Sequence, residues 1–207
     1  MKPTVILMIL IGFLLQALFI KTEHDEKYLL ADILKGSASL MFVLIGLVFG
    51  MIGDILLNLR YVFPKHGQKI FLAGIVAFLI GHIMYLLALI PQAQHVWIWY
   101  CVIIGALAAG ALLAYIFKTM EVKKAFKIFG IFYLGAVFIM TAIALGIAIF
   151  TPSKRALIYA VGAVLFTASD VVLIFNTFSG VSRFSMRITN LTLYYLGQIL
   201  IACSLFF

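Results

Sequence analysis

The sequence predicts an all-α fold, a polytopic membrane helical bundle of seven transmembrane helices, with eight as the alternative, forming a single domain over residues 1–207. Of these 207 residues 66% are hydrophobic and 11% are charged, whereas a soluble domain has about 45–50% apolar and about 25% charged residues. The net charge of +8 comes from Lys and Arg in short segments between apolar runs. This distribution argues against a nucleic-acid partner, which would need a basic face.

Long apolar runs predict the individual spans. A helix needs roughly 20 apolar residues to cross a hydrocarbon core of about 30 Å. Seven stretches meet this standard, at 3–20, 29–59, 69–90, 96–117, 125–150, 156–178 and 188–207. Cys101 and Cys203 both fall inside such runs, where a thiol behaves as a small hydrophobe.

The first two stretches need separate interpretation. Residues 3–20 resemble a signal peptide, but no small-x-small cleavage site precedes Lys21, so we expect a retained helix. The 31 residues of 29–59 would form a helix of about 47 Å, too long for one upright span. We expect an interfacial piece at 29–36 followed by a tilted span, and an eighth span is the alternative.

The positive charges predict the orientation in the membrane. Ten Lys and Arg residues fall on one side, namely Lys2, Arg60, Lys65, Lys69, Lys118, Lys123, Lys124, Lys127, Arg183 and Arg187. Five fall on the other, namely Lys21, Lys27, Lys35, Lys154 and Arg155. The richer side is expected in the cytoplasm and the carboxyl terminus outside. We therefore expect an integral membrane protein, in the inner membrane if the cell is bacterial.

Two aspartates stand out among the seven acidic residues. Asp54 and Asp170 each lie inside an apolar span, whereas the other acids lie in or beside loops: Glu23, Asp25, Glu26, Asp32 and Glu121. A charged side chain at the centre of a span costs about 2.5–3.5 kcal/mol on insertion scales, so an intramembrane carboxyl points to function. The alternative is a structural carboxyl that links helices through hydrogen bonds.

Topology places the two aspartates at the same depth. Three spans separate their helices, so the two helices run parallel, and both acids lie toward the predicted cytoplasmic loops. Gly53 and Ser169 immediately precede them, and small residues allow neighbouring helices to approach closely. We expect the two carboxyls to share one cavity and to act as an acid/base pair.

A few other polar residues lie in or near the spans. His82 follows Asp54 by 28 residues, and Gln198 follows Asp170 by the same interval, which hints at a degenerate two-helix repeat. Asn58 could line the same cavity or simply end its helix. One buried histidine with two carboxylates makes a poor metal site, so we expect no metal and no cofactor. A Gly-x-Gly-Asp protease motif is also absent, because Met51 occupies the first glycine's place.

At these residues the sequence resembles the YhhN family, whose characterised members are lysoplasmalogenases. The matching segments, in the family's order, are 50–57 (GMIGDILL), 74–85 (GIVAFLIGHIMY), 166–170 (FTASD) and 194–200 (YYLGQIL). The family's two motif aspartates fall on Asp54 and Asp170. The chain departs from the family's usual Lys-Pro at Lys35-Gly36 and has less sequence between that lysine and Asp54. About 28 Å of helical rise would separate the two, which argues against Lys35 holding a phosphate near the acids.

The resemblance implies hydrolysis of the vinyl ether bond of a lysoplasmalogen, a lysophospholipid, to a fatty aldehyde and a glycerophospho-alcohol. Such chemistry needs a carboxylic acid to protonate the alkene and a carboxylate to stabilise the resulting cation, as in glycosidases. Proposed orienting or substrate-binding groups are His82, Tyr85, Asn58, Tyr194, Tyr195, Gln198 and Ser169. The rival hypothesis is a small proton-coupled transporter or lipid carrier, because paired membrane acids also mark proton relays.

Overall fold

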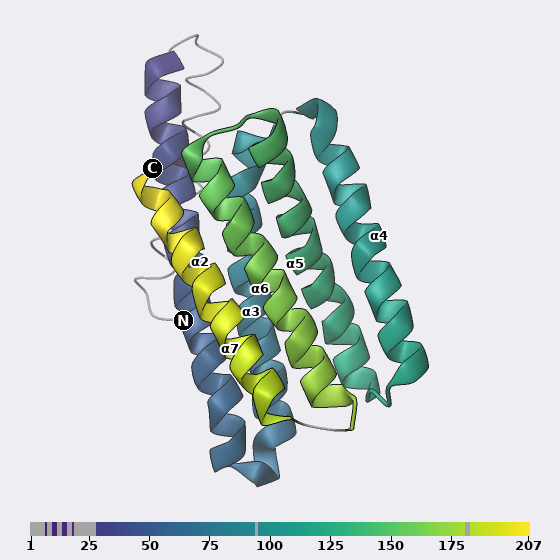
Figure 1. Cartoon of the computed structure of the whole chain (residues 1–207). Helices are drawn as coiled ribbons and strands as arrows, with labels where there is room; N and C mark the ends of the chain where they lie inside the picture. The colour runs from purple at the N-terminus through teal and green to yellow at the C-terminus, as the bar shows by residue number, and fades with distance from the viewer. Residues whose placement is uncertain are drawn as a thin grey trace.

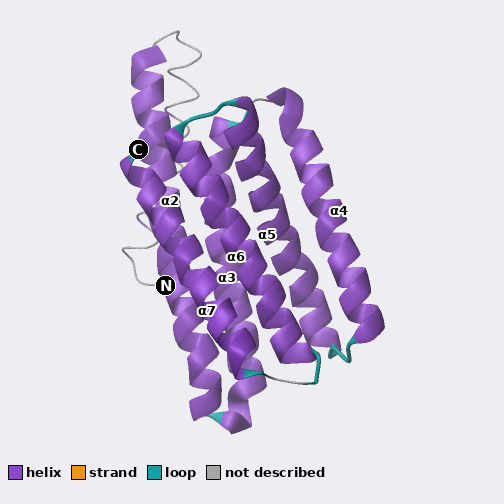
Figure 2. Cartoon of the chain, in the orientation of Figure 1, coloured by secondary structure: helices purple, strands orange, loops and turns teal. Residues whose placement is uncertain are grey.

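The structure, a computed structural model, describes residues 28–93, 95–180 and 183–207, and before them positions 7, 10, 11, 14, 15 and 18. Its elements are helices that run side by side in alternating directions (Figures 1 and 2). In chain order they are α2 (Tyr28–Val62), η1 (Pro64–His66), α3 (Gly67–Leu89), η2 (Ile90–Gln92), α4 (His95–Thr119), α5 (Lys124–Phe150), α6 (Lys154–Phe178), α7 (Phe184–Cys203) and η3 (Ser204–Phe206). The described part of the chain is thus all-α, as predicted.

Membrane-spanning length is reached by six helices within the described residues. They match the predicted spans from the second to the seventh. The predicted first helix, at 3–20, lies outside the described residues except at a few positions. The expected total of seven or eight spans therefore stays a prediction.

The second apolar stretch differs from its predicted form. Helix α2 is continuous from Tyr28 to Val62, and its apolar span covers Leu40–Arg60. The predicted interfacial piece and the predicted span thus belong to one continuous helix, and the interfacial position of 29–36 stays a prediction. A glycine inside a helix costs about 1 kcal/mol relative to alanine, so Gly36 alone does not end this helix. The amino-terminal part of α2 extends beyond the other helices (Figure 1).

Local sequence signals set the helix ends. The Ser153 side chain caps α6 by accepting a hydrogen bond from the Ala156 amide at 3.0 Å, as N-cap residues do. Pro64 begins η1, and Pro91 lies in η2, two short turns that reverse the chain. Gly180, with φ of 78°, follows α6 in the left-handed region that favours glycine.

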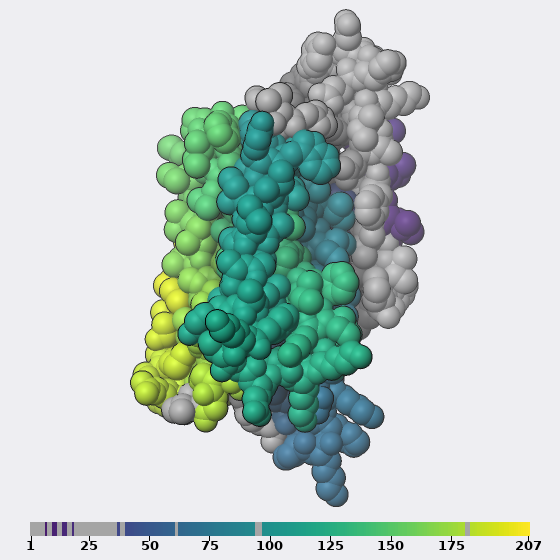
Figure 3. All heavy atoms as spheres, turned by 90° about the vertical axis from the view of Figure 1, so that its right-hand side faces the viewer, coloured from purple at the N-terminus to yellow at the C-terminus, as the bar shows by residue number. Residues whose placement is uncertain are grey.

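The helices pack in a defined order of neighbours. Helix α2 packs on α3, α3 on α5, α5 on α6, and α6 on α7. Helix α4 packs mainly on α5 and stands at the edge of the bundle (Figures 1 and 3). Its outer side chains, including Trp99, Ile104 and Leu107, are exposed. Exposed apolar side chains on such a helix are suited to contact with lipid.

Glycine pairs bring two of the helix pairs into close contact. A Cβ atom added at Gly162 of α6 would lie 2.8 Å from the carbonyl oxygen of Gly197 in α7, and the converse holds. In the α2–α3 pair, a Cβ atom added at Gly81 would lie 3.1 Å from the carbonyl oxygen of Gly46. Small residues at both contacts let the backbones approach in a way that larger side chains would prevent.

Candidate functional site

A cavity of about 730 Å³ occupies one half of the bundle, which we call the open half. This half lies toward the turns that join α2 to α3, α4 to α5 and α6 to α7 (Figure 1). All six spanning helices contribute lining residues. Asp54 and Asp170 both face the cavity, from the carboxyl-terminal parts of α2 and α6. The structure therefore brings the two predicted carboxyls to one cavity.

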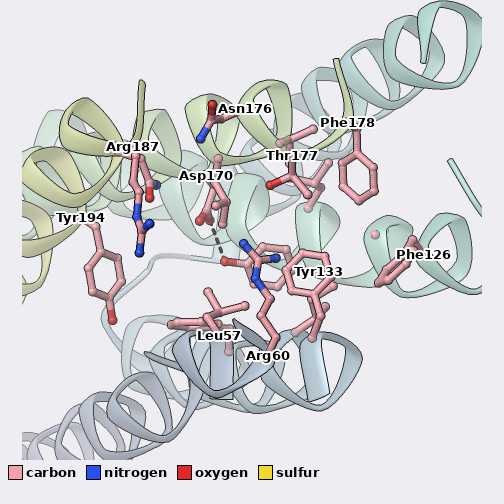
Figure 4. A pocket seen from close by; sticks show the side chains of 18 of the residues that line it. Leu57, Arg60, Phe126, Tyr133, Asp170, Asn176, Thr177, Phe178, Arg187 and Tyr194 are labelled. Atoms are coloured by element: carbon pink, nitrogen blue, oxygen red, sulfur yellow. Dashed lines mark hydrogen bonds between the residues drawn. The ribbon is translucent and has the colours of Figure 1, made fainter. Parts of the chain in front are cut away.

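Asp170 lies at the inner end of the cavity and is 4% exposed. Its Oδ2 atom accepts a hydrogen bond from the hydroxyl of Tyr133 in α5 at 2.7 Å (Figure 4). Tyr133 is also buried and lines the cavity. A buried carboxyl needs such a partner, because an unsatisfied polar group in an apolar surrounding is costly. Helix α5 thus orients the carboxyl of α6.

Asp54 is held by a longer chain of hydrogen bonds. Its Oδ2 atom accepts a bond from the Tyr194 hydroxyl at 2.9 Å. Tyr194 accepts a bond from Gln198 Nε2 at 3.2 Å, and Gln198 Oε1 accepts one from the Tyr85 hydroxyl at 2.9 Å. The Gln198 amide uses its oxygen toward Tyr85 and its nitrogen toward Tyr194. Each donor in the chain therefore lies on the Tyr85 side of its bond, and each acceptor lies on the Asp54 side.

The two aspartates occupy equivalent places in an internal repeat. Asp170 lies 116 residues after Asp54, and the same interval relates His82 to Gln198. It also relates the packed glycine pairs, because Gly46 and Gly81 correspond to Gly162 and Gly197. The α2–α3 hairpin is therefore repeated, in the same direction, as the α6–α7 hairpin. The equal spacing noted in the sequence has a structural basis in these glycine contacts.

A layer of aromatic rings closes the inner end of the cavity. Phe78, Tyr133 and Tyr194 line it, and the ring centroids of Phe78 and Tyr194 are 6.1 Å apart. Behind them lie Phe166, at 5.3 Å from Tyr194, and His82, at 4.7 Å from Phe166. This layer separates the carboxyls from the rest of the bundle.

The structure sorts the remaining predicted site residues into three groups. Asn58, Tyr194 and Tyr195 line the cavity. Tyr85 and Gln198 lie behind the lining and reach Asp54 through the hydrogen-bond chain.

His82 and Ser169 do not line the cavity. His82 is 1% exposed, and its Nδ1 atom bonds to the Phe78 carbonyl oxygen at 2.8 Å, which leaves Nε2 buried without a hydrogen-bond partner. Ser169 donates to the Phe166 carbonyl at 2.7 Å, and its own carbonyl accepts a bond from Asn190 at 2.8 Å. Gly53, the other small residue beside an acid, faces Phe78 of α3. These residues shape the helix contacts around the carboxyls.

Three residues of the cavity were not singled out by the sequence. Tyr133 lies in an apolar span with no motif around it, so nothing in the sequence indicates that its hydroxyl bonds to Asp170. Arg60 and Arg187 line the cavity, although their sequence position near span ends indicated only membrane orientation. Both lie on the predicted side of the membrane toward which the two acids are displaced, and that shared side was the one available signal.

The site offers little to a metal ion. Within the described residues, no three His, Cys, Asp or Glu side chains are grouped as metal ligands would be. The groups that face the cavity instead suit proton transfer and hydrogen bonding.

These features place the protein among helical membrane proteins with an acid-bearing cavity in one half of the bundle. Comparison with protein families refines that class. The sequence model of the YhhN family matches residues 1–205, so the chain belongs to the YhhN family. Comparisons with curated proteins and with solved structures gave no match.

Proposed function

We propose that this protein is a membrane hydrolase that cleaves the vinyl ether bond of lysoplasmalogens, with Asp54 and Asp170 as its catalytic residues. The observation that carries the proposal is the placement of both carboxyls, each bound by a tyrosine hydroxyl, on one cavity of lipid-accommodating size. Membership of the YhhN family supports a reaction on a lipid. An enzyme of this class needs no group beyond two carboxyls and water.

The hydrogen bonds support a division of labour between the carboxyls. Tyr194 accepts from Gln198, so its own proton points to Asp54, which suits Asp54 to act as a carboxylate. The hydroxyl of Tyr133 can donate to a carboxylate or accept from a carboxylic acid. It can therefore serve Asp170 both before and after proton transfer. We assign proton delivery to Asp170 and stabilisation of the cation to Asp54.

The reaction then proceeds in three steps, namely protonation of the alkene, addition of water and collapse of the hemiacetal. The Asp170 proton passes to the alkene carbon nearest the fatty chain, and the alkene π electrons form the new C–H bond. Positive charge develops on the other alkene carbon and the ether oxygen, facing the Asp54 carboxylate. Water adds to that carbon and gives a proton to Asp54.

Collapse of the hemiacetal restores the site. The bond between the former alkene carbon and the glycerol oxygen breaks. The hemiacetal hydroxyl proton returns to Asp170 as the aldehyde forms, and Asp54 gives its proton to the glycerol oxygen. Both carboxyls are back in their starting forms, and the products are a fatty aldehyde and a glycerophospho-alcohol.

The direct test measures aldehyde release from a vinyl ether lysophospholipid by the purified full chain in detergent. Wild type should release aldehyde, whereas Asp54→Asn should lose about 10²-fold or more of the rate. Glu121→Gln is the matched control, because Glu121 lies outside the cavity lining and should retain full activity. Equal rates for wild type and Asp54→Asn would remove Asp54 from the mechanism.

Solvent deuterium gives a second readout of the same proposal. In D₂O the proton that Asp170 delivers is replaced by deuterium, so the aldehyde should carry one deuterium on the carbon next to the carbonyl group. Mass spectrometry of the aldehyde, trapped at once to prevent exchange, measures this. Aldehyde without that deuterium would exclude protonation of the alkene as the first step.

A second candidate function is proton-coupled transport of a small lipid. The chain from Tyr85 through Gln198 and Tyr194 to Asp54 favours it, because polar groups that continue inward from a cavity also occur in proton pathways. Reconstituted vesicles with a pH gradient and a fluorescent lysolipid would test it. Gradient-driven accumulation of the lipid, lost in Asp54→Asn, would favour transport over hydrolysis.

A further inference from the structure

The outer part of the cavity carries positive charge. Arg60, in the last turn of α2, and Arg187, in the first turn of α7, both line it. Figure 4 shows Arg60 and Arg187 extending from opposite walls of the pocket that Asp170 and Tyr133 also line. Two guanidinium groups on one cavity provide donors for an anion with several oxygen atoms, and guanidinium binds phosphate through paired hydrogen bonds.

The setting of Arg60 keeps its guanidinium group at this place. Its Cζ atom lies 4.4 Å from the ring centroid of Phe71, which also lines the cavity. A cation over an aromatic face is held there by the ring's charge distribution. The guanidinium group carries five N–H donors in a planar fork, and Arg60 presents it among the residues that line the cavity.

The arginines and the carboxyls lie at different depths. About 9 Å of helical rise separates Asp54 from Arg60 along α2, and about 10 Å separates Tyr194 from Arg187 along α7. In a glycerophospholipid with one chain, a glycerol unit lies between the ether oxygen and the phosphate. When the phosphate is bound by the arginines, the vinyl ether of the same lipid can therefore lie at the depth of the carboxyls.

Polar and apolar lining residues are suited to the two parts of such a lipid. Asn176, Thr177 and Asn190 lie on the cavity from α6 and α7, the side of Arg187. Leu113 and Ile116 of α4 line it with apolar side chains. Apolar side chains such as Leu173 and Leu191 lie among these polar groups on α6 and α7, so the cavity offers contacts both to a phosphate and to a hydrocarbon chain.

We propose that Arg60 and Arg187 form a phosphate-binding site that holds the phosphodiester of a single-chain glycerophospholipid, with its ether bond directed toward Asp54 and Asp170. This rests on the proposed function for the position of the scissile bond. The binding of phosphate is separable from the reaction, and so is its test.

Binding is tested with a saturated alkyl-ether lysophospholipid, which has no alkene to protonate. Thermal unfolding of the full chain in detergent is followed as the lipid is added. Wild type should be stabilised, and Arg60→Gln and Arg187→Gln should each raise the apparent Kd about tenfold or more. Arg183→Gln is the matched control, because Arg183 is the N-cap residue of the same helix and is not among the lining residues. Its apparent Kd should equal that of wild type.

Two further ligands identify the chemistry that is bound. The corresponding alkylglycerol, which lacks the phosphate, should bind wild type and both arginine variants equally. Inorganic phosphate at millimolar concentration should stabilise none of them. If the arginine variants lose alkylglycerol binding as much as they lose ether-lipid binding, the phosphate assignment is overturned. If inorganic phosphate stabilises wild type as much as the lipid does, the site is one for free phosphate instead.

Charge-retaining variants distinguish a loss of phosphate binding from a failure of the protein to fold. Arg60→Lys and Arg187→Lys keep the positive charge and lose the paired donors. They should bind the ether lipid more weakly than wild type and more tightly than the Gln variants. Wild type that binds the lipid through both arginines and releases no aldehyde would refute the proposed reaction and leave the phosphate site standing. Lipid binding unchanged in both Gln variants would overturn the site.

Discussion

The half of the bundle beyond the aromatic layer, which we call the closed half, is built from the same helices as the open half. The two halves differ in packing. The open half encloses about 730 Å³, whereas the cavity among Val43, Ala144 and Tyr159 in the closed half measures about 10 Å³. The closed half is packed with fully buried side chains such as Phe42, Ile45 and Met140. The closed half therefore holds the helices together, and this support lets the open half keep a cavity with charged groups inside the membrane.

In both α2 and α6 the glycine contact lies in the closed half and the acid lies in the open half. In α6, Gly162 meets Gly197 in the closed half, and Asp170 faces the cavity about two helical turns later. In α2, Gly46 and Asp54 have the same order. Substitutions in one half should thus affect stability and those in the other should affect activity, and the following predictions test that separation.

The largest effect is expected at the buried acid. Asp170→Asn should lower aldehyde release by about 10²–10⁴-fold, because general acid catalysis contributes a factor of that size. The amide still bonds to Tyr133, so the unfolding temperature should stay near that of wild type. Aldehyde assays and thermal unfolding on one preparation measure both. A variant that retains full activity would exclude Asp170 as the acid.

The next effect concerns stability and compares two glycines. Gly162→Ala should lower the free energy of unfolding by about 1–3 kcal/mol, as overpacking does, because its Cβ atom would lie 2.8 Å from the Gly197 carbonyl. Gly130→Ala is the matched control on the cavity, since nothing lies within 4 Å of its added Cβ atom. It should be neutral or raise stability by up to about 1 kcal/mol. Equal losses in both variants would contradict the contrast between the halves.

A smaller effect is expected from the tyrosine that holds Asp170. Tyr133→Phe removes the hydroxyl at 2.7 Å from Asp170 Oδ2 and keeps the ring in its layer. Aldehyde release should fall about tenfold, the size expected when a hydrogen bond to an ionisable group is lost. Tyr115→Phe, which changes an exposed tyrosine outside the cavity lining, should have no effect. Steady-state rates of the two variants would decide this.

The smallest effect is expected at the far end of the hydrogen-bond chain. Tyr85→Phe removes the bond to Gln198 at 2.9 Å and leaves Tyr194 bonded to Asp54. The loss should be about two- to tenfold in aldehyde release, since an ordinary hydrogen bond contributes about 0.5–1.5 kcal/mol. Tyr194→Phe should cost more. The reverse order would show that orientation of Gln198 matters more than the direct bond to the carboxyl.

The sequence by itself determined the class of fold and the two acids. Apolar runs of bilayer length allow only helices here, because backbone groups within lipid must bond to one another. The six described spans follow those runs. Asp54 and Asp170 were recognisable because burying a carboxyl in a span is costly, and the parallel direction of their helices followed from counting spans. Both do face one cavity.

Only the tertiary structure decided which groups surround the acids. Tyr133 lies 37 residues from Asp170, and Tyr194 lies 140 residues from Asp54. Such pairs depend on which helices are neighbours and how each is rotated, and hydrophobicity along the chain carries no such information. The same rotation turns His82 into the aromatic layer and places Arg60 and Arg187 on the cavity. Side-chain direction is set by packing, so the sequence located the acids and the fold selected their partners.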